Sequence, residues 1–113
     1  MQLAYLVQNN VLIITPKIDR LDALIAPSFK EEVIDLLVQS EYKHVLFDLH
    51  ELQFIDSSGL GTFLSVLRAI HHKGGELKLT SLNKPVRTIF ELVSMHKIFE
   101  IFNSIDEAVG SFK

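Results

Sequence analysis

Short apolar runs near the N-terminus and in the middle of the chain predict β-strands. The runs Tyr5–Val7 and Val11–Thr15 are separated by the polar stretch Gln8–Asn10. Because asparagine tolerates a positive φ angle, this stretch predicts a hairpin turn. Pro16 ends the second run, since proline cannot donate a ladder hydrogen bond. The run Val45–Phe47 shows little alternation, which is typical of a central strand covered on both faces.

Three longer stretches carry apolar residues at helical spacing. These residues are Phe29, Val33, Leu36 and Leu37 in the first stretch, Leu60, Phe63, Leu64, Leu67 and Ile70 in the second, and Val86, Ile89, Phe90 and Val93 in the third. Proline is comfortable only in a first turn, so the first helix is predicted to begin between Asp22 and Pro27. Gly74 and Gly75 end the second helix, and Asn83 is the expected N-cap of the third.

The remaining patterns complete one α/β domain. Leu77 and Leu79 alternate with polar residues and predict a strand, and a shorter strand is expected within residues 98–102. The stretch Ser104–Glu107 matches a capping box and opens a C-terminal helix. Strands that alternate with helices favour right-handed crossovers and a mostly parallel sheet. We therefore expect one domain over residues 1–113, with four to five strands, an N-terminal antiparallel hairpin and about four helices.

The periodicity also predicts which side chains form the core. The expected core residues are Leu46, Phe47, Leu64, Leu67, Leu77, Leu79, Ile89 and Phe90. Nearly half of the 113 residues are apolar, so a chain of this length can bury an ordinary core.

Charge and composition indicate which kinds of partner are disfavoured and in which compartment the protein is expected. The formal net charge is −3 and there is no basic stripe, which disfavours nucleic acid and anionic membranes as partners. The chain has no cysteine, so neither disulfides nor thiol chemistry are available. The N-terminus lacks the pattern of a signal peptide, and no apolar run approaches the roughly 20 residues that span a bilayer. A soluble cytoplasmic protein is expected.

The most distinctive stretch is FIDSSGLG, at residues 54–61, which joins an apolar run to the second helix. In an alternating α/β fold, such a loop lies at the carboxyl end of the sheet, where these folds place their sites. Asp56 or Ser57 can cap the helix, and Gly59 and Gly61 allow another surface to approach its first turn. Capping alone would explain two serines in an arbitrary sequence of this kind.

Catalysis by this loop is disfavoured. A nucleophile elbow needs glycine on both sides of its serine, and Ile55 occupies the position before Ser57. The chain has no Gly-Lys-Ser/Thr ending of a phosphate-binding loop, and Gly59-Leu60-Gly61 is too short for a dinucleotide site. Adjacent helical residues point about 100° apart, so His71 and His72 cannot share a metal ion from one helix face. We expect no enzyme activity, no cofactor and no metal.

A phosphate acceptor is the remaining possibility for the loop. A hydroxyl at a helix N-terminus is well placed to carry a phosphate, because the free N–H groups and the helix dipole favour an anion there. The phosphate would add a charge of about −1.5 to −2 beside Asp56 and would change the surface offered to a partner. These physical arguments permit such a switch but do not select it.

The whole chain resembles the STAS domain family, most closely the bacterial anti-sigma factor antagonists. Asp48-Leu49 and the FIDSSGLG stretch are similar to the family's D-L…F-[IM]-D-S-[ST]-G-L-G signature. Weaker similarities follow the rest of the chain. They are Leu21-Asp22-Ala23 with Ala26-Pro27, Gly74-Gly75-Glu76-Leu77, Val86-Arg87 with Phe90-Glu91-Leu92, and Lys97-Ile98-Phe99.

The resemblance implies a partner switch. In that family, the serine after the aspartate is phosphorylated by an anti-sigma factor that is also a serine kinase, and a PP2C-type serine phosphatase resets the cycle. The phosphoacceptor then falls on Ser57. The expected partner-binding residues are Asp22, Asp56, Ser57, Ser58 and Gly59. The resemblance further implies that ATP belongs to the kinase, and we expect a monomer or weak dimer.

One departure leaves the partner open. Family members usually carry glycine two residues before the L-D pair, where this chain has Asp19, followed by Arg20. Aspartate adopts a positive φ less easily than glycine, and both residues add charge near the expected contact surface. Two alternatives stay open: a STAS subunit of a transport assembly that packs against an ATPase, without control by Ser57, and a small serine hydrolase.

Overall fold

The computed structural model describes residues 3–112 and contains a five-stranded sheet in the order β1-β2-β4-β6-β7. The strands are β1 (Leu3–Gln8), β2 (Val11–Pro16), β4 (His44–Asp48), β6 (Glu76–Thr80) and β7 (Glu100–Phe102). β1 and β2 form an antiparallel hairpin, and the other neighbours are parallel. The predicted architecture is confirmed. The first two residues and the last of the expected 1–113 domain lie outside the described residues.

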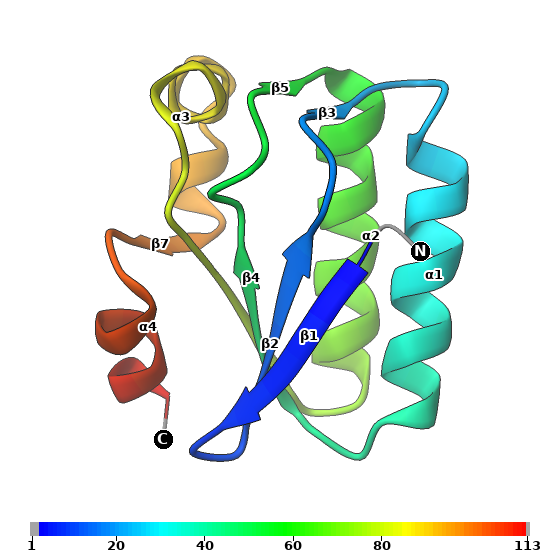
Figure 1. Ribbon diagram of the computed structural model, residues 1–113, viewed down its shortest axis with the longest axis vertical. Coiled ribbons are helices and arrows are strands. Elements are labelled where there is room, and N and C mark those ends of the chain that lie inside the picture. The colour runs from blue at the N-terminus through cyan, green and yellow to red at the C-terminus, as the bar shows by residue number, and fades with distance from the viewer. Residues whose placement is uncertain (1–2, 113) are drawn as a thin grey trace.

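The helices cover the two faces of the sheet unequally (Figure 1). They are α1 (Ala26–Gln39), α2 (Ser57–His72), α3 (Lys84–Leu92), the 3₁₀ helix η1 (Met95–Lys97) and α4 (Ile105–Ser111). The larger apolar cluster joins the sheet to α1, α2 and α3, whereas a smaller cluster joins it to α4. None of the helices among residues 3–112 has the length and apolarity needed to cross a bilayer.

Local sequence signals set the element boundaries as predicted. Asn9 and Asn10 form the two-residue hairpin turn with φ angles of 51° and 66°. Pro27 lies in the first turn of α1, where its missing N–H costs nothing. α2 ends just before Gly74, whose φ of 79° is the left-handed conformation that ends many helices.

Aromatic rings form the centre of the larger core. Phe63 of α2 packs edge-on against Phe29 of α1 and Phe47 of β4, with ring centroids 6.0 Å and 5.4 Å apart. Phe90 of α3 continues the cluster. Six of the eight predicted core residues are buried, and Leu64 and Ile89 are the two that are not.

The two wrong core predictions have one physical cause. Leu64 and Ile89 are half-buried and pack against the margins of the core, because each lies at the edge of the buried face of its helix. On α2, Ile70 of the predicted stripe is fully buried, and so is Val66, which the stripe did not include. Val93, predicted on the apolar stripe of α3, lies just after the helix and is exposed.

The second face of the sheet buries a lysine that the strand pattern did not indicate. Lys78 of β6 lies under α4, where its Nζ donates hydrogen bonds to the hydroxyl and the carbonyl oxygen of Ser111 at 2.8 Å and 3.1 Å. The same Nζ lies 4.6 Å from the ring centroid of Phe112. The lysine therefore fixes the end of α4 on the sheet.

The N-caps of α3 and α4 lie at the predicted residues, but only one of the two side chains makes a capping hydrogen bond. Ser104 caps α4 by accepting a hydrogen bond from the N–H of Glu107, as the capping box predicts. Asn83 occupies the N-cap position of α3, but its side chain makes no capping hydrogen bond. Its amide instead donates to the carbonyl oxygens of His50 and Leu52, so Asn83 ties α3 to the segment after β4.

Candidate functional site

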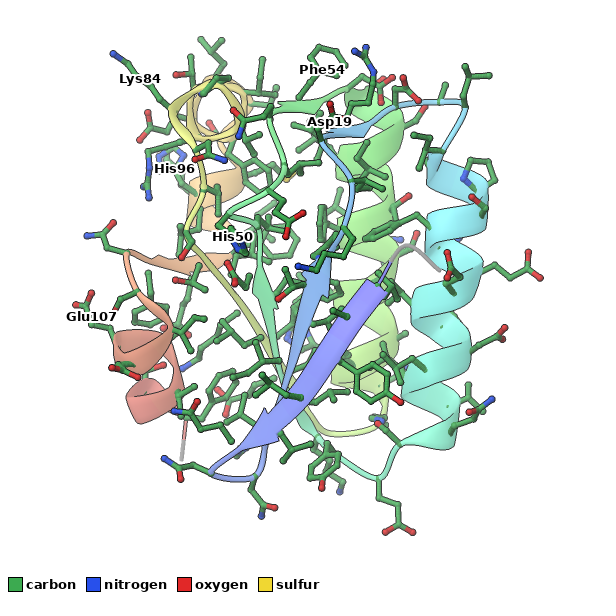
Figure 2. The ribbon with its side chains drawn as sticks, in the orientation of Figure 1. Asp19, His50, Phe54, Lys84, His96 and Glu107 are labelled. Atoms are coloured by element: carbon green, nitrogen blue, oxygen red, sulfur yellow. The ribbon has the colours of Figure 1, made fainter. Side chains whose placement is uncertain are left out.

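A second, two-stranded sheet lies at the carboxyl end of the main sheet and positions the FIDSSGLG loop (Figure 1). Its strands are β3 (Arg20–Leu21) and β5 (Phe54–Ile55), which pair in parallel. The carbonyl oxygen of Asp19 accepts the N–H of Phe54 at 3.1 Å, and Figure 2 shows these two residues at the same end of the molecule. Two segments distant in sequence therefore form one surface.

Asp56 links the two segments of this surface. Its Oδ1 accepts hydrogen bonds from the N–H groups of Ser58 and Gly59 at 2.9 Å and 3.1 Å, which caps α2. Its Oδ2 accepts the N–H of Ala23, in the segment before α1, at 3.1 Å. Both carboxylate oxygens are therefore engaged within the chain, and Asp56 holds the loop in place.

Gly59 is required by the close approach of β3. A Cβ atom added there would lie 2.6 Å from the carbonyl oxygen of Leu21 and 2.7 Å from a side-chain carbon of Ile55. Only a residue without a side chain lets the first turn of α2 approach the paired strands this closely. Gly59 is buried, so its contribution to the surface is indirect.

Asp22 organises the segment that leads into α1. Its Oδ1 accepts the N–H groups of Leu24 and Ile25 at 3.1 Å and 3.3 Å, an Asx turn. Its Oδ2 accepts a hydrogen bond from Nε of Arg20 at 3.1 Å. This bond is the main reason that the pKa of Asp22 lies below its ordinary value, and the two backbone N–H groups lower it further against an opposing effect of burial.

The two serines of the loop are both exposed, but they face different surroundings. Ser57 is the first residue of α2, and within residues 3–112 its hydroxyl has no hydrogen-bond partner. Ser58 borders an open groove of about 440 Å³ between the first turns of α1 and α2, together with Pro27 and Lys30. Exposure therefore does not separate the two hydroxyls. Their positions relative to this groove do separate them.

Asp19 does not adopt the positive φ angle that glycine would permit at this position. In the described part of the chain, the residues other than glycine with positive φ angles are Asn9, Asn10, Ser81 and Ser94. Asp19 is not among them, so it is not strained. The expected difficulty at this position is therefore absent, and what remains of the departure is its charge.

Sequence patterns did not indicate the aromatic and aliphatic groups that border the loop. The guanidinium of Arg20 lies 4.8 Å from the ring centroid of Phe54, directly across the β3–β5 pair. Phe54 is 43% exposed and Leu24 is 90% exposed. Leu24 stands in the mostly apolar stretch Leu21–Ala26, so no sequence pattern indicated that its side chain is exposed. These side chains add exposed apolar surface to the two segments.

The histidines do not support catalysis at the loop. Nδ1 of His50 is hydrogen-bonded to a carboxylate oxygen of Asp48 at 2.9 Å, a local contact at the end of β4. Among residues 3–112 no hydrogen bond joins a histidine to the hydroxyl of Ser57 or Ser58. The same residues contain no group of three or more histidine, aspartate or glutamate side chains arranged to hold a metal ion.

Comparisons with known proteins agree with this architecture. The STAS domain model matches residues 2–108. An anti-sigma-B factor antagonist of Listeria monocytogenes is 31% identical over 91 residues, which is 80% of this chain and 79% of that protein. An anti-sigma F factor antagonist of Paenibacillus polymyxa is 33% identical over 70 residues, and this match spans 62% of the chain but only 60% of the relative's length.

The solved structures extend the likeness to nearly the whole chain. The crystal structure of a "putative anti-sigma factor antagonist" from Thermotoga maritima superposes with a TM-score of 0.86 at 28% identity. The superposition covers 96% of this chain and 92% of that one. Since the family model ends at residue 108, the domain boundaries at residues 1 and 113 stay a prediction.

Proposed function

The chain belongs to the STAS domain family, and we propose that it is an anti-sigma factor antagonist that binds its partner when Ser57 is unphosphorylated. The partner is an anti-sigma factor that is also a serine kinase. Phosphorylation of Ser57 releases the chain, and a PP2C-type serine phosphatase restores the binding form. The chain acts as a binding module in the cytoplasm, without catalysis of its own.

One observation carries the proposal: the exposed hydroxyl of Ser57 has no hydrogen-bond partner among residues 3–112, and the loop that carries it is held by hydrogen bonds. Ser57 begins α2, and Asp56 beside it is fixed by hydrogen bonds to both the helix and the N–H of Ala23. A kinase would therefore meet the hydroxyl in a fixed position, and adding a phosphate requires no rearrangement of the loop. The names of the relatives support the same partner class.

The electrostatics of the loop explain how a phosphate would act. The N-terminus of α2 favours an anion, so the modified chain should stay folded with nearly unchanged far-UV circular dichroism. Asp56, beside Ser57, and Asp22, in the segment before α1, carry carboxylates on the two segments that form this surface. A charge of about −1.5 to −2 added beside them changes the binding surface strongly. We expect binding to weaken at least about tenfold, equivalent to about 1.4 kcal/mol.

Capture from the native host identifies the partner and tests the proposal. Ser57→Ala serves as bait because it cannot be released by phosphorylation, and Ser57→Asp serves as the matched bait that mimics the modified form. Mass spectrometry should find an anti-sigma factor kinase on the first bait and little of it on the second. Calorimetry with the purified kinase should then give about tenfold weaker binding for Ser57→Asp than for Ser57→Ala. Equal capture of a transport ATPase on both baits would contradict the proposal.

A further inference from the structure

The strand β1 forms an edge of the main sheet that the proposed function does not use. Its sequence LAYLVQ contains no charged residue and no proline. Natural edge strands are commonly protected from further pairing by charges, proline or bulges. The hairpin turn of β1 and β2 lies at the opposite end of the molecule from β3 and β5 (Figure 1). This edge is therefore open and remote from Ser57.

The register of the hairpin shows which backbone groups face outward. A two-residue turn closes on a hydrogen-bonded pair, here Gln8 with Val11, and such pairs alternate along an antiparallel ladder. The N–H and C=O groups of Leu3, Tyr5 and Val7 then point away from β2. The pairing of Leu3 with Pro16, which has no N–H group, agrees with this phase. The edge presents three residues with backbone groups free to pair.

The side chains of this edge are apolar and exposed. Tyr5, Leu6 and Val7 are 57%, 57% and 44% exposed. Beside them, a groove of about 260 Å³ separates β1 from α1. The groove is lined by Leu3, Tyr5, Glu32, Asp35, Leu36 and Gln39. An extended segment laid along β1 would therefore meet apolar side chains and, on the α1 side, two carboxylates.

The carboxylates decide what kind of segment fits. Glu32 and Asp35 line the groove beside the apolar residues, and the Asp35 carboxylate offers an opposite charge to a cationic side chain on the added strand. Antiparallel pairing of two copies through β1 would place both α1 helices on the same face of one continuous sheet. Each copy would then place its acidic groove residues on that same face, and such like charges disfavour self-association.

We propose that the β1 edge binds an extended, basic segment of a partner protein as an added sixth strand. Backbone groups of Leu3, Tyr5 and Val7 hold the segment, in the manner of strand addition to a sheet edge. Its apolar side chains cover Tyr5 and Leu36, and a lysine or arginine pairs with Asp35. This surface is separate from the Ser57 loop, so both could be occupied together.

Nuclear magnetic resonance titration of the full chain tests the proposal with a synthetic probe. The probe is a short peptide in which valines alternate with threonines and lysines, and the same peptide with glutamates in place of the lysines is the control. We expect the lysine peptide to shift the amide signals of β1 and of Glu32 and Asp35, and not those of Ser57 and Ser58. The glutamate peptide should bind at least about tenfold more weakly.

Two variants and a control separate the contribution of the β1 backbone to peptide binding from that of the charge. Val7→Pro removes one outward N–H group and should abolish binding while the urea unfolding curve stays close to wild type, since edge strands tolerate proline where the N–H faces solvent. Asp35→Lys should reverse the preference between the two peptides. Glu91→Lys, the same charge change on the exposed surface of α3, should leave it unchanged.

Three results would overturn the proposal. One is the absence of shifts in β1 with either peptide, and another is equal binding of the lysine and glutamate peptides. The third is a concentration-dependent dimer in sedimentation experiments that Val7→Pro disrupts, because a second copy would then occupy the edge.

Discussion

The carboxylate of Asp56 accepts a hydrogen bond from the N–H of Ala23 at 3.1 Å, across 33 residues of sequence. This bond joins the segment before α1 to the start of α2. The same carboxylate caps α2, so one side chain determines both the helix start and the spacing of the two segments. The exposed hydroxyl of Ser57 owes its fixed position to this arrangement.

Removal of the Asp56 carboxylate should therefore destabilise the fold. Asp56→Ala loses the N-cap and leaves the N–H of Ala23 without its acceptor, so we expect a loss of about 1–3 kcal/mol in the free energy of unfolding. Urea denaturation measures it. Ser57→Ala is the matched control, because the Ser57 hydroxyl makes no hydrogen bond within residues 3–112 and its loss should cost less than about 0.5 kcal/mol. Equal losses for the two variants would show that Asp56 does not organise the loop.

The two glycines of the loop should respond oppositely to alanine. A methyl group at Gly59 meets the carbonyl oxygen of Leu21 at 2.6 Å, so Gly59→Ala should destabilise the chain by about 1–3 kcal/mol. At Gly61 a methyl group has no neighbour within 4 Å, so Gly61→Ala should stabilise α2 by about 0.5–1 kcal/mol. Thermal and urea unfolding of both variants measure the difference. The same sign for both changes would contradict the close approach of β3 to α2.

Truncation of a fully buried side chain should cost more unfolding free energy than truncation of a half-buried one. Phe90→Ala removes a buried ring and should cost about 3–5 kcal/mol. Leu64→Ala, at the margin of the core, should cost less than about 2 kcal/mol. The free energies of unfolding from urea curves test this order, and a larger loss at Leu64 would mean that α2 packs with a different face.

The Arg20–Asp22 pair makes a prediction about pH. The pKa of Asp22 is lowered in the folded chain from an ordinary value of 3.8. The ionised carboxylate therefore favours folding above that value, and the contribution disappears as pH falls through the lower, folded pKa. Arg20→Gln should raise the pKa of Asp22 toward its ordinary value, as measured by carboxyl ¹³C chemical shifts.

Lys17→Gln is the control for this titration. Lys17 pairs with Glu51 at 2.6 Å, and this pair is the main reason that the pKa of Glu51 is lowered. The substitution should raise the pKa of Glu51 and leave that of Asp22 unchanged. If Arg20→Gln does not move the pKa of Asp22, the side chains of Arg20 and Asp22 do not pair in solution.

Sequence patterns predicted the elements whose residues repeat over several turns or strand positions, and missed contacts between distant residues. The hairpin at Asn9 and Asn10 and the helix cap at Ser104 depend on neighbouring residues, so they could be read directly. β3 and β5 contain two residues each, too few to show any period. Lys78 is buried by Ser111 and Phe112, which lie more than 30 residues away in sequence.

In the candidate site, too, features set by neighbouring residues could be predicted, whereas contacts between distant residues could not. The N-cap role of Asp56 could be predicted from its position before a helix, whereas its bond to Ala23 depends on the pairing of β3 with β5. The acceptor role of Ser57 comes from a family resemblance, because composition and spacing only permit a phosphate there. The interaction of Arg20 with Phe54 required the structure, since the two residues are aligned by the cross-strand register.

The most direct test of the account is phosphopeptide mapping after incubation with the partner kinase and ATP. Wild type and Ser58→Ala should carry phosphate on Ser57, and Ser57→Ala should carry none. Phosphate on Ser58 alone, or on neither serine, would contradict the assignment of Ser57 as the residue that controls binding.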